Sequence, residues 1–189
     1  SAYLDNDLDE YETNATVTFW LNKVSQETVV LALSAELWKY LEAPAVSFPA
    51  EDPEYHWLYV KAPMEVRIQN PPPVRLTATV SNLTGSVTAY ITAMPTHVVF
   101  KPGDGDTDIQ YCTIEHATMD YLGPQTPAGC LVTYYNSSAI HQGHQFPTQT
   151  ELWYDVDTSS GIYSGSPVGT YTQRSVSVAE IQAVVVHNP

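Results

Sequence analysis

The chain has 189 residues, of which 43% are hydrophobic and 11% aromatic, so one packed domain is expected and global disorder is not. Only 7 Lys+Arg stand against 21 Asp+Glu, which gives a formal net charge of −14. This balance excludes nucleic-acid binding, which needs clustered cations, and opposes contact with an anionic membrane surface. No apolar run approaches the roughly 20 residues of a spanning helix, so we expect no membrane insertion.

The first dozen residues are strongly acidic. They predict either a solvated tail or a tail that docks on a basic partner, with carboxylates at Asp5, Asp7, Asp9, Glu10 and Glu12. A strand is predicted over residues 16–21. A helix is predicted from an N-cap at Ser34, with Pro44 beyond its end. Its apolar face would carry Leu37, Trp38 and Leu41.

Apolar and polar residues alternate most clearly over residues 74–80 and again over 87–93. Alternation with period two is the pattern of a strand with one buried face. The turn sequence Asn82-Leu83-Thr84-Gly85 separates the two runs. The sequence therefore predicts a β-hairpin here.

Other segments share a β-branched and aromatic composition that is typical of strands. They are residues 28–33, 57–60, 65–69, 97–100, 109–112, 131–135, 150–156, 174–178 and 181–186. Proline cannot donate to a strand ladder, and prolines fall mostly between these runs. These prolines are Pro44, Pro49, Pro53, Pro71, Pro72, Pro73, Pro95 and Pro102.

Many short strands with regular turns predict an all-β, antiparallel sandwich. Residues 157–170 are rich in Ser, Gly and Pro and predict a long loop. The pattern changes near residue 56. We therefore expect residues 1–56 to form an acidic tail plus a strand and helix elaboration, and residues 57–189 to form the sandwich, together as one structural unit.

The two cysteines, Cys112 and Cys130, flank a stretch with Gly, Pro and Thr. They predict either two buried thiols or a disulfide across a long loop, which would contribute about 3 kcal/mol in the chain-entropy model. A disulfide would indicate an oxidising compartment. Only His116 lies nearby, so a zinc site is not expected.

Several motifs occur in a fixed order along residues 57–189. A strand ends in a Gly-Asp-Gly turn, a cysteine pair follows, and then come a Tyr strand with a Ser-Ser step, a Trp strand and a terminal segment. The residues are Gly103-Asp104-Gly105, Cys112, Cys130, Tyr134-Tyr135-Asn136-Ser137-Ser138, Trp153 and Val178-Ala179-Glu180-Ile181-Gln182-Ala183. This succession resembles the PKD-like, Ig-like β-sandwich domain of secreted actinobacterial proteins. One departure is Phe100-Lys101-Pro102, where the family has an aromatic–acidic pair before the turn.

The resemblance implies a secreted or cell-surface module without catalytic activity. Members of this group mostly lack an assigned activity. The family therefore indicates an extracellular location and a sandwich fold, and it names no ligand.

A calcium site is the main alternative to a plain turn at residues 103–108. Asp104, Asp106 and Asp108 alternate, and Glu115 stands where an EF-hand would place its bidentate carboxylate. Ile109 replaces the EF-hand glycine, which leaves a looser calcium site as the metal hypothesis. The alternative is a tight turn in which Asp104 accepts backbone N–H groups.

Further polar and aromatic residues carry weaker signals. His141 and His144 lack a third local ligand, and no G-x-S-x-G elbow is present, so Ser137-Ser138 is expected to stabilise a turn. The four tryptophans are expected in the core, with stacking on sugars as the alternative. N-x-S/T triplets occur at Asn14, Asn82 and Asn136.

The function predicted first is a noncatalytic structural and interaction module that binds a protein partner or assembles with itself, for example in a surface filament. The apolar segment with Val17, Phe19 and Leu21 would then be a candidate donated strand. The alternative is a carbohydrate-binding module, with or without calcium. An enzyme of another type would require a carboxylate or His with a perturbed pKa in a deep cleft.

Overall fold

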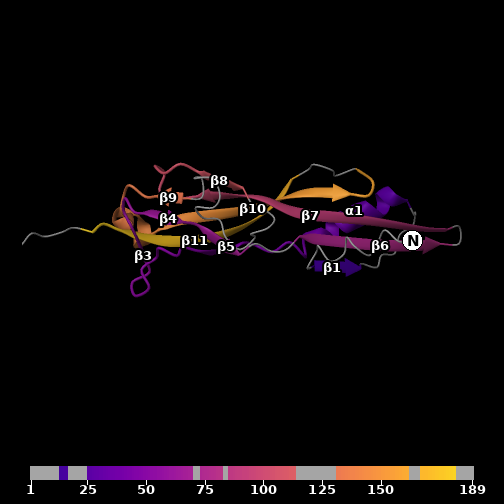
Figure 1. Cartoon of the computed structure of the whole chain (residues 1–189), viewed down its shortest axis with the longest axis horizontal. Helices are drawn as coiled ribbons and strands as arrows, with labels where there is room; N and C mark the ends of the chain where they lie inside the picture. Colours follow the sequence, from indigo (N-terminus) through magenta and orange to yellow (C-terminus); the bar gives the residue numbers. More distant parts are fainter. Residues whose placement is uncertain are drawn as a thin grey trace, which may run out of the picture. The chain divides into compact units, whose positions relative to one another are not determined.

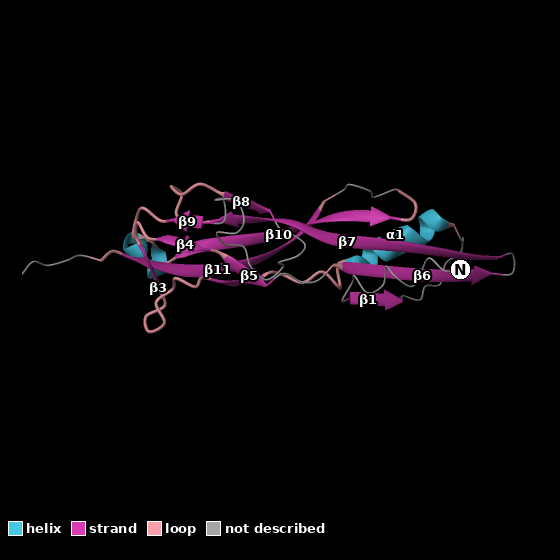
Figure 2. Cartoon of the chain, viewed as in Figure 1, coloured by secondary structure: helices cyan, strands magenta, loops and turns pink. Residues whose placement is uncertain are grey.

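The computed structural model describes residues 13–16, 25–69, 73–82, 85–113, 131–161 and 167–181. Strands dominate these residues, as predicted (Figure 1, Figure 2). The strands are β1 (Thr13–Thr16), β2 (Ala45–Ser47), β3 (Trp57–Tyr59), β4 (Pro63–Glu65), β5 (Arg67–Gln69), β6 (Val74–Asn82), β7 (Gly85–Lys101), β8 (Gln110–Thr113), β9 (Leu131–Thr133), β10 (Phe146–Thr158) and β11 (Val168–Ala179). The helices are α1 (Gln26–Leu37) and the short 3₁₀ turns η2 (Ser138–Ile140) and η3 (Gln142–His144).

A seven-stranded sheet runs in the order β1-β6-β7-β10-β11-β3, with β8 also paired to β7. Two small sheets pair β2 with β5 and β4 with β9, both antiparallel. The pairings β1–β6 and β11–β3 are parallel, which departs from the antiparallel arrangement that we predicted. Their partners are distant in sequence, so no hairpin turn imposes an antiparallel direction.

The described residues form two compact units, each assembled from three stretches. Unit 1 comprises Ser1–Pro44, Asn70–His97 and Leu152–Thr170, and unit 2 comprises Ala45–Gln69, Val98–Glu151 and Tyr171–Pro189. Strands β7, β10 and β11 contribute residues to both units. The division into residues 1–56 and 57–189 stays a prediction.

The hairpin predicted at residues 74–93 is confirmed in unit 1. Strands β6 and β7 pair antiparallel from Val74↔Ala93 to Asn82↔Gly85. The alternation places small and branched residues on the buried face: Val74, Leu76, Ala78, Ala89, Ile91 and Ala93 are all at most 1% exposed. Helix α1 packs against β6. Alanines on the buried face leave room for the helix backbone to approach the sheet.

The predicted start of the helix is wrong. Helix α1 begins after Ser25, whose hydroxyl accepts the Thr28 N–H at 3.2 Å. Ser34 lies inside the helix and its hydroxyl donates to the Leu31 carbonyl at 2.8 Å. The strand predicted at residues 28–33 is part of the same helix. The β-branched Val29 and Val30 are typical of a strand, but in the structure they form, together with Leu33, an apolar stripe that the helix buries.

Prolines mark fewer boundaries than predicted. Pro95 lies inside β7, and Pro147 lies inside β10. Strand β6 starts at Val74, opposite Ala93, so Pro95 lies beyond the β6–β7 pairing.

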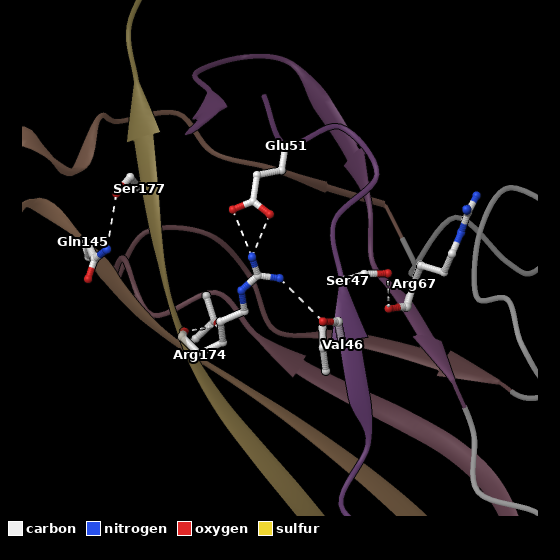
Figure 3. Close-up of polar contacts among 8 residues, drawn as sticks. Val46, Ser47, Glu51, Arg67, Gln145, Arg174 and Ser177 are labelled. Atoms are coloured by element: carbon white, nitrogen blue, oxygen red, sulfur yellow. Dashed lines mark hydrogen bonds and ion pairs between the residues drawn. The ribbon is translucent and has the colours of Figure 1, made fainter. Parts of the chain in front are cut away.

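The core of unit 2 contains aromatic rings. Phe48 and Phe100 meet edge to face with centroids 5.8 Å apart, and Tyr134 stacks on Phe146 at 5.4 Å. Arg174 lies over the Phe48 ring at 5.0 Å, and one of its guanidinium nitrogens donates to both carboxylate oxygens of Glu51, at 2.6 and 3.0 Å (Figure 3). These contacts of Arg174 with Phe48 and Glu51 connect β11 to the segment after β2.

The predominance of strands is confirmed, and the Ig-like arrangement of two facing sheets stays a prediction. In the described part of the chain, no helix combines the length and apolar character that crossing a membrane requires.

Candidate binding site

Three hollows lie in unit 2 near the ends of β3 and β11. The largest, of about 460 Å³, is lined by Trp57, Ser137, Ser138, Ala139, His144, Ser177, Val178, Ala179 and Glu180. We call it the Trp57 hollow. Two others, of about 350 and 310 Å³, are lined in part by Val60, Lys61 and Glu180. Glu180 therefore lies at the junction of all three.

Large apolar side chains remain exposed around these hollows. Trp57 is 43% exposed, Tyr135 62%, Ile140 91% and Ile181 73%. Each of the four lines at least one of the hollows. We call these four residues with the three hollows the Trp57 face. Exposed apolar side chains that gather around a concavity are typical of interaction surfaces.

A stacked aromatic pair adjoins the Trp57 hollow. The Tyr55 and Trp57 rings are 5.2 Å apart with 27° between their planes. Asp52 shapes the loop before them, since its carboxylate accepts the N–H groups of Glu54 at 2.9 Å and Tyr55 at 2.8 Å and the Tyr59 hydroxyl at 3.1 Å. The two backbone N–H groups are the main cause of a lowered pKa of Asp52.

Backbone strain is concentrated at the same place. Among the described residues, the non-glycine residues with positive φ are His56 (57°), Lys61 (61°) and His144 (57°). His144 and Lys61 line hollows, and His56 directly precedes Trp57. Left-handed conformations cost energy in residues with a Cβ and are often found at functional sites.

Ser138 and His144 lie together at the Trp57 hollow, but their polar groups serve the backbone. The buried Ser138 hydroxyl accepts the Val178 N–H at 2.9 Å and donates to the His144 carbonyl at 2.7 Å. His144 Nδ1 lies 2.6 Å from the Ala139 carbonyl, which can only accept, so Nδ1 carries a proton. Ser138 therefore stabilises the turn, as the sequence predicted for the Ser137-Ser138 step.

The predicted metal residues form a hydrogen-bonded turn. Asp104 accepts the Thr107 N–H at 2.9 Å and the Thr107 hydroxyl at 2.6 Å. Asp106 accepts from the Asn136 side chain at 2.8 Å, and Asp108 is exposed. In the part of the chain that the structure describes, no three His, Cys, Asp or Glu residues gather as a metal would need. Glu115 lies outside the described residues, and calcium binding stays a prediction.

Gly103 is required by this turn. Its φ is +79°, and a Cβ there would lie 2.0 Å from the Pro147 carbonyl oxygen. The buried Tyr134 hydroxyl donates to the neighbouring Pro102 carbonyl at 3.0 Å, and burial is the main cause of the raised pKa of Tyr134. The Gly-Asp-Gly motif thus has a demonstrated structural role.

Two further predictions rest partly on residues outside the described ranges. Cys112 is buried, but Cys130 is not among the described residues, so the disulfide stays a prediction. Asn136 is exposed, whereas the side chains of Asn14 and Asn82 are not described.

The expectation that the tryptophans fill the core is wrong for two of them. Trp38 is 53% exposed in unit 1, and Trp57 is exposed in unit 2. Trp153 is half-buried and stacks on His97 at 6.0 Å, and Trp20 lies outside the described residues. The Trp57 face could not be predicted from the sequence, because its members are far apart in the chain and follow no motif. The Tyr55-His56-Trp57 spacing was the one available signal.

No protein-family model, curated protein or solved structure matches this chain. The resemblance to PKD-like domains therefore stays a prediction.

Proposed function

We propose that this protein is a noncatalytic extracellular interaction module that binds a protein partner through the Trp57 face. One observation carries the proposal: four large apolar side chains remain exposed around adjoining hollows in unit 2. Burying them against a partner would remove apolar surface from water, which is the main favourable term in association.

The polar groups of the Trp57 hollow support the noncatalytic part of the proposal. A nucleophilic serine needs a base that accepts its proton. The Ser138 hydroxyl accepts the Val178 N–H and donates its proton to the His144 backbone carbonyl, so its hydrogen bond is not directed to the His144 ring. The extracellular part of the proposal depends on the sequence resemblance and on the predicted disulfide.

Site-specific photo-crosslinking tests the proposal. A photoreactive benzoylphenylalanine replaces Ile140 in the full chain, and a matched variant carries it at Leu31, which is 50% exposed in unit 1. Each is added to intact cells of the producing organism and irradiated. We expect one defined adduct from position 140 that disappears when Trp57→Ala is added. Adducts of equal yield from both positions, or none from position 140, would contradict the proposal.

Carbohydrate binding remains the second candidate, and the stacked Tyr55–Trp57 pair favours it. The C–H groups of a sugar ring pack against the electron-rich face of an aromatic ring. A glycan array read with and without EDTA tests this function and its calcium dependence together. Retention of a sugar that Trp57→Ala abolishes would support it.

A further inference from the structure

The lining of the Trp57 hollow combines an indole ring and small apolar residues with serine hydroxyls, the His144 ring and one carboxylate, Glu180. No Lys or Arg is among the described residues that line it. Glu180 contributes a carboxylate, and within the described part of the chain no hydrogen bond or ion pair to it is found. In the neutral His144 ring, Nδ1 donates to the Ala139 carbonyl, which leaves Nε2 as an acceptor. This lining suits a group that donates hydrogen bonds and carries positive charge.

The charge of the chain points the same way. A formal net charge of −14 attracts cations to the surface and raises their rate of encounter. The same charge opposes a second copy of this chain as the occupant. Trp is the aromatic side chain that binds cations most strongly over its face, and a partly desolvated site strengthens this attraction.

We infer that the Trp57 hollow receives a Lys or Arg side chain of the protein partner, with Glu180 as its counter-charge. The inference rests on the proposed function and names the chemistry of the partner. Ile140 and Ile181 line the two adjoining hollows. They would contact apolar residues next to that cation and help to exclude water, since the most important contacts of an interface are surrounded by contacts that keep water out. The partner segment is therefore basic and apolar.

Two capped tripeptides serve as probes for this chemistry. One is acetyl-Ile-Arg-Ile-amide, and the other has citrulline in place of arginine, which keeps the shape and removes the charge. Each is titrated into the full chain while amide and indole N–H signals are followed by NMR. We expect the arginine peptide to shift the Trp57 indole signal and to bind about fivefold more tightly than the citrulline peptide, the upper range for one partly exposed charge pair.

Two variants assign the effect to Glu180. Glu180→Gln should reduce the affinity for the arginine peptide and leave only the smaller advantage over the citrulline peptide that the Trp57 ring supplies. Asp108→Asn is the matched control, because it removes one exposed negative charge of unit 2 at a residue that lines none of the three hollows. We expect the control to change affinity by less than about twofold, since salt weakens the effect of solvent-exposed charges that do not contact the ligand.

Three results would overturn the inference. The first is that the two peptides bind with equal affinity, and the second is that Glu180→Gln binds the arginine peptide as tightly as the unaltered chain does. The third is that neither peptide shifts the Trp57 indole signal, whereas a neutral oligosaccharide such as cellotetraose shifts it. If the two peptides bound equally and Trp57→Ala abolished both, the preference for a cation would be wrong, and the Trp57 face would still be a binding surface. If the photoreactive residue at position 140 gave no adduct in the otherwise unaltered chain, the proposed function itself would be wrong.

Discussion

Unit 1 is stabilised by an apolar helix on a sheet of small residues, whereas unit 2 is stabilised by aromatic rings and polar contacts between distant segments. In unit 1, α1 buries Val29, Val30, Leu33 and Leu37 completely or almost so. In unit 2, Arg174 pairs with Glu51 and lies over the Phe48 ring, which Phe100 meets edge to face.

The difference bears on function. Where ion pairs and tight turns hold loops in place, apolar side chains on those loops need not be buried for the fold, and they stay available for a partner. Unit 2 exposes Trp57, Tyr135, Ile140 and Ile181 around hollows. Leu31 and Trp38 of unit 1 are also exposed, but single exposed apolar residues are normal on a protein surface.

The turn at Gly103 offers the largest expected effect in unit 2. Gly103→Ala would bring a Cβ to 2.0 Å from the Pro147 carbonyl oxygen at a φ of +79°. Overpacking and left-handed strain together predict a loss of about 4 kcal/mol in the free energy of unfolding. Gly105→Ala is the control, because its φ is +83° and nothing lies within 4 Å. It should lose about 1 kcal/mol. Urea unfolding measures both, and equal losses would show that the approach to Pro147 is unimportant.

The buried face of α1 provides the corresponding experiment in unit 1. Leu33 is 0% exposed and Leu31 is 50% exposed on the same helix. Leu33→Ala should reduce the free energy of unfolding by about 3 kcal/mol, because it removes buried methyl groups and leaves a cavity. Leu31→Ala should change it by about 0.5 kcal/mol or less. Similar losses in thermal unfolding would contradict the assignment of the buried face.

The ion pairs of the two units make the comparison sharper. Arg174→Gln would leave Glu51, whose side chain is 16% exposed, without its cation, and we expect a loss of about 2 kcal/mol. Lys39→Gln in unit 1 removes a partner of Glu36, but the Lys39 side chain is 67% exposed. That loss should be about 0.3 kcal/mol. Equal losses in urea unfolding would mean that burial does not distinguish the two pairs.

Much of the sheet could be predicted because alternation is a local signal. The β6–β7 hairpin follows from period-two patterning and a short turn. The strand expected at residues 28–33 failed because Val29, Val30 and Leu33 suit a buried helix stripe as well as a strand. An N-cap residue distinguishes a helix from a strand in such a segment, and the N-cap here is Ser25 and not Ser34.

The candidate site depends on contacts that no local pattern encodes. Trp57, Ile140 and Glu180 come from three separate segments that converge in unit 2. The Gly-Asp-Gly turn was visible in the sequence, but the reason for its first glycine is the approach to Pro147, more than forty residues away. Parallel pairing of β11 with β3 is likewise a long-range feature.

The smallest expected effect is the pH dependence that Asp52 gives to unit 2. Hydrogen bonds from the Tyr55 and Glu54 N–H groups lower the pKa of Asp52 in the folded chain. A lowered pKa means that the ionised carboxylate favours folding above the unfolded value of about 3.9, and that this contribution is lost as the pH falls through the folded value. Asp52→Asn should therefore reduce stability by a constant amount above about pH 5, and the difference from the unaltered chain should shrink below about pH 4.

Urea unfolding at intervals between pH 3 and pH 7 measures this difference. Asp108→Asn is the control, because it also removes one exposed carboxylate of unit 2 and no hydrogen bond to its side chain is found within the described residues. If Asp52→Asn and Asp108→Asn gave the same pH profile, the carboxylate of Asp52 would not be shaping the loop that carries Tyr55 and Trp57. Because that loop forms one side of the Trp57 face, Asp52→Asn should also weaken the Ile140 crosslink, which connects this small change in stability to binding.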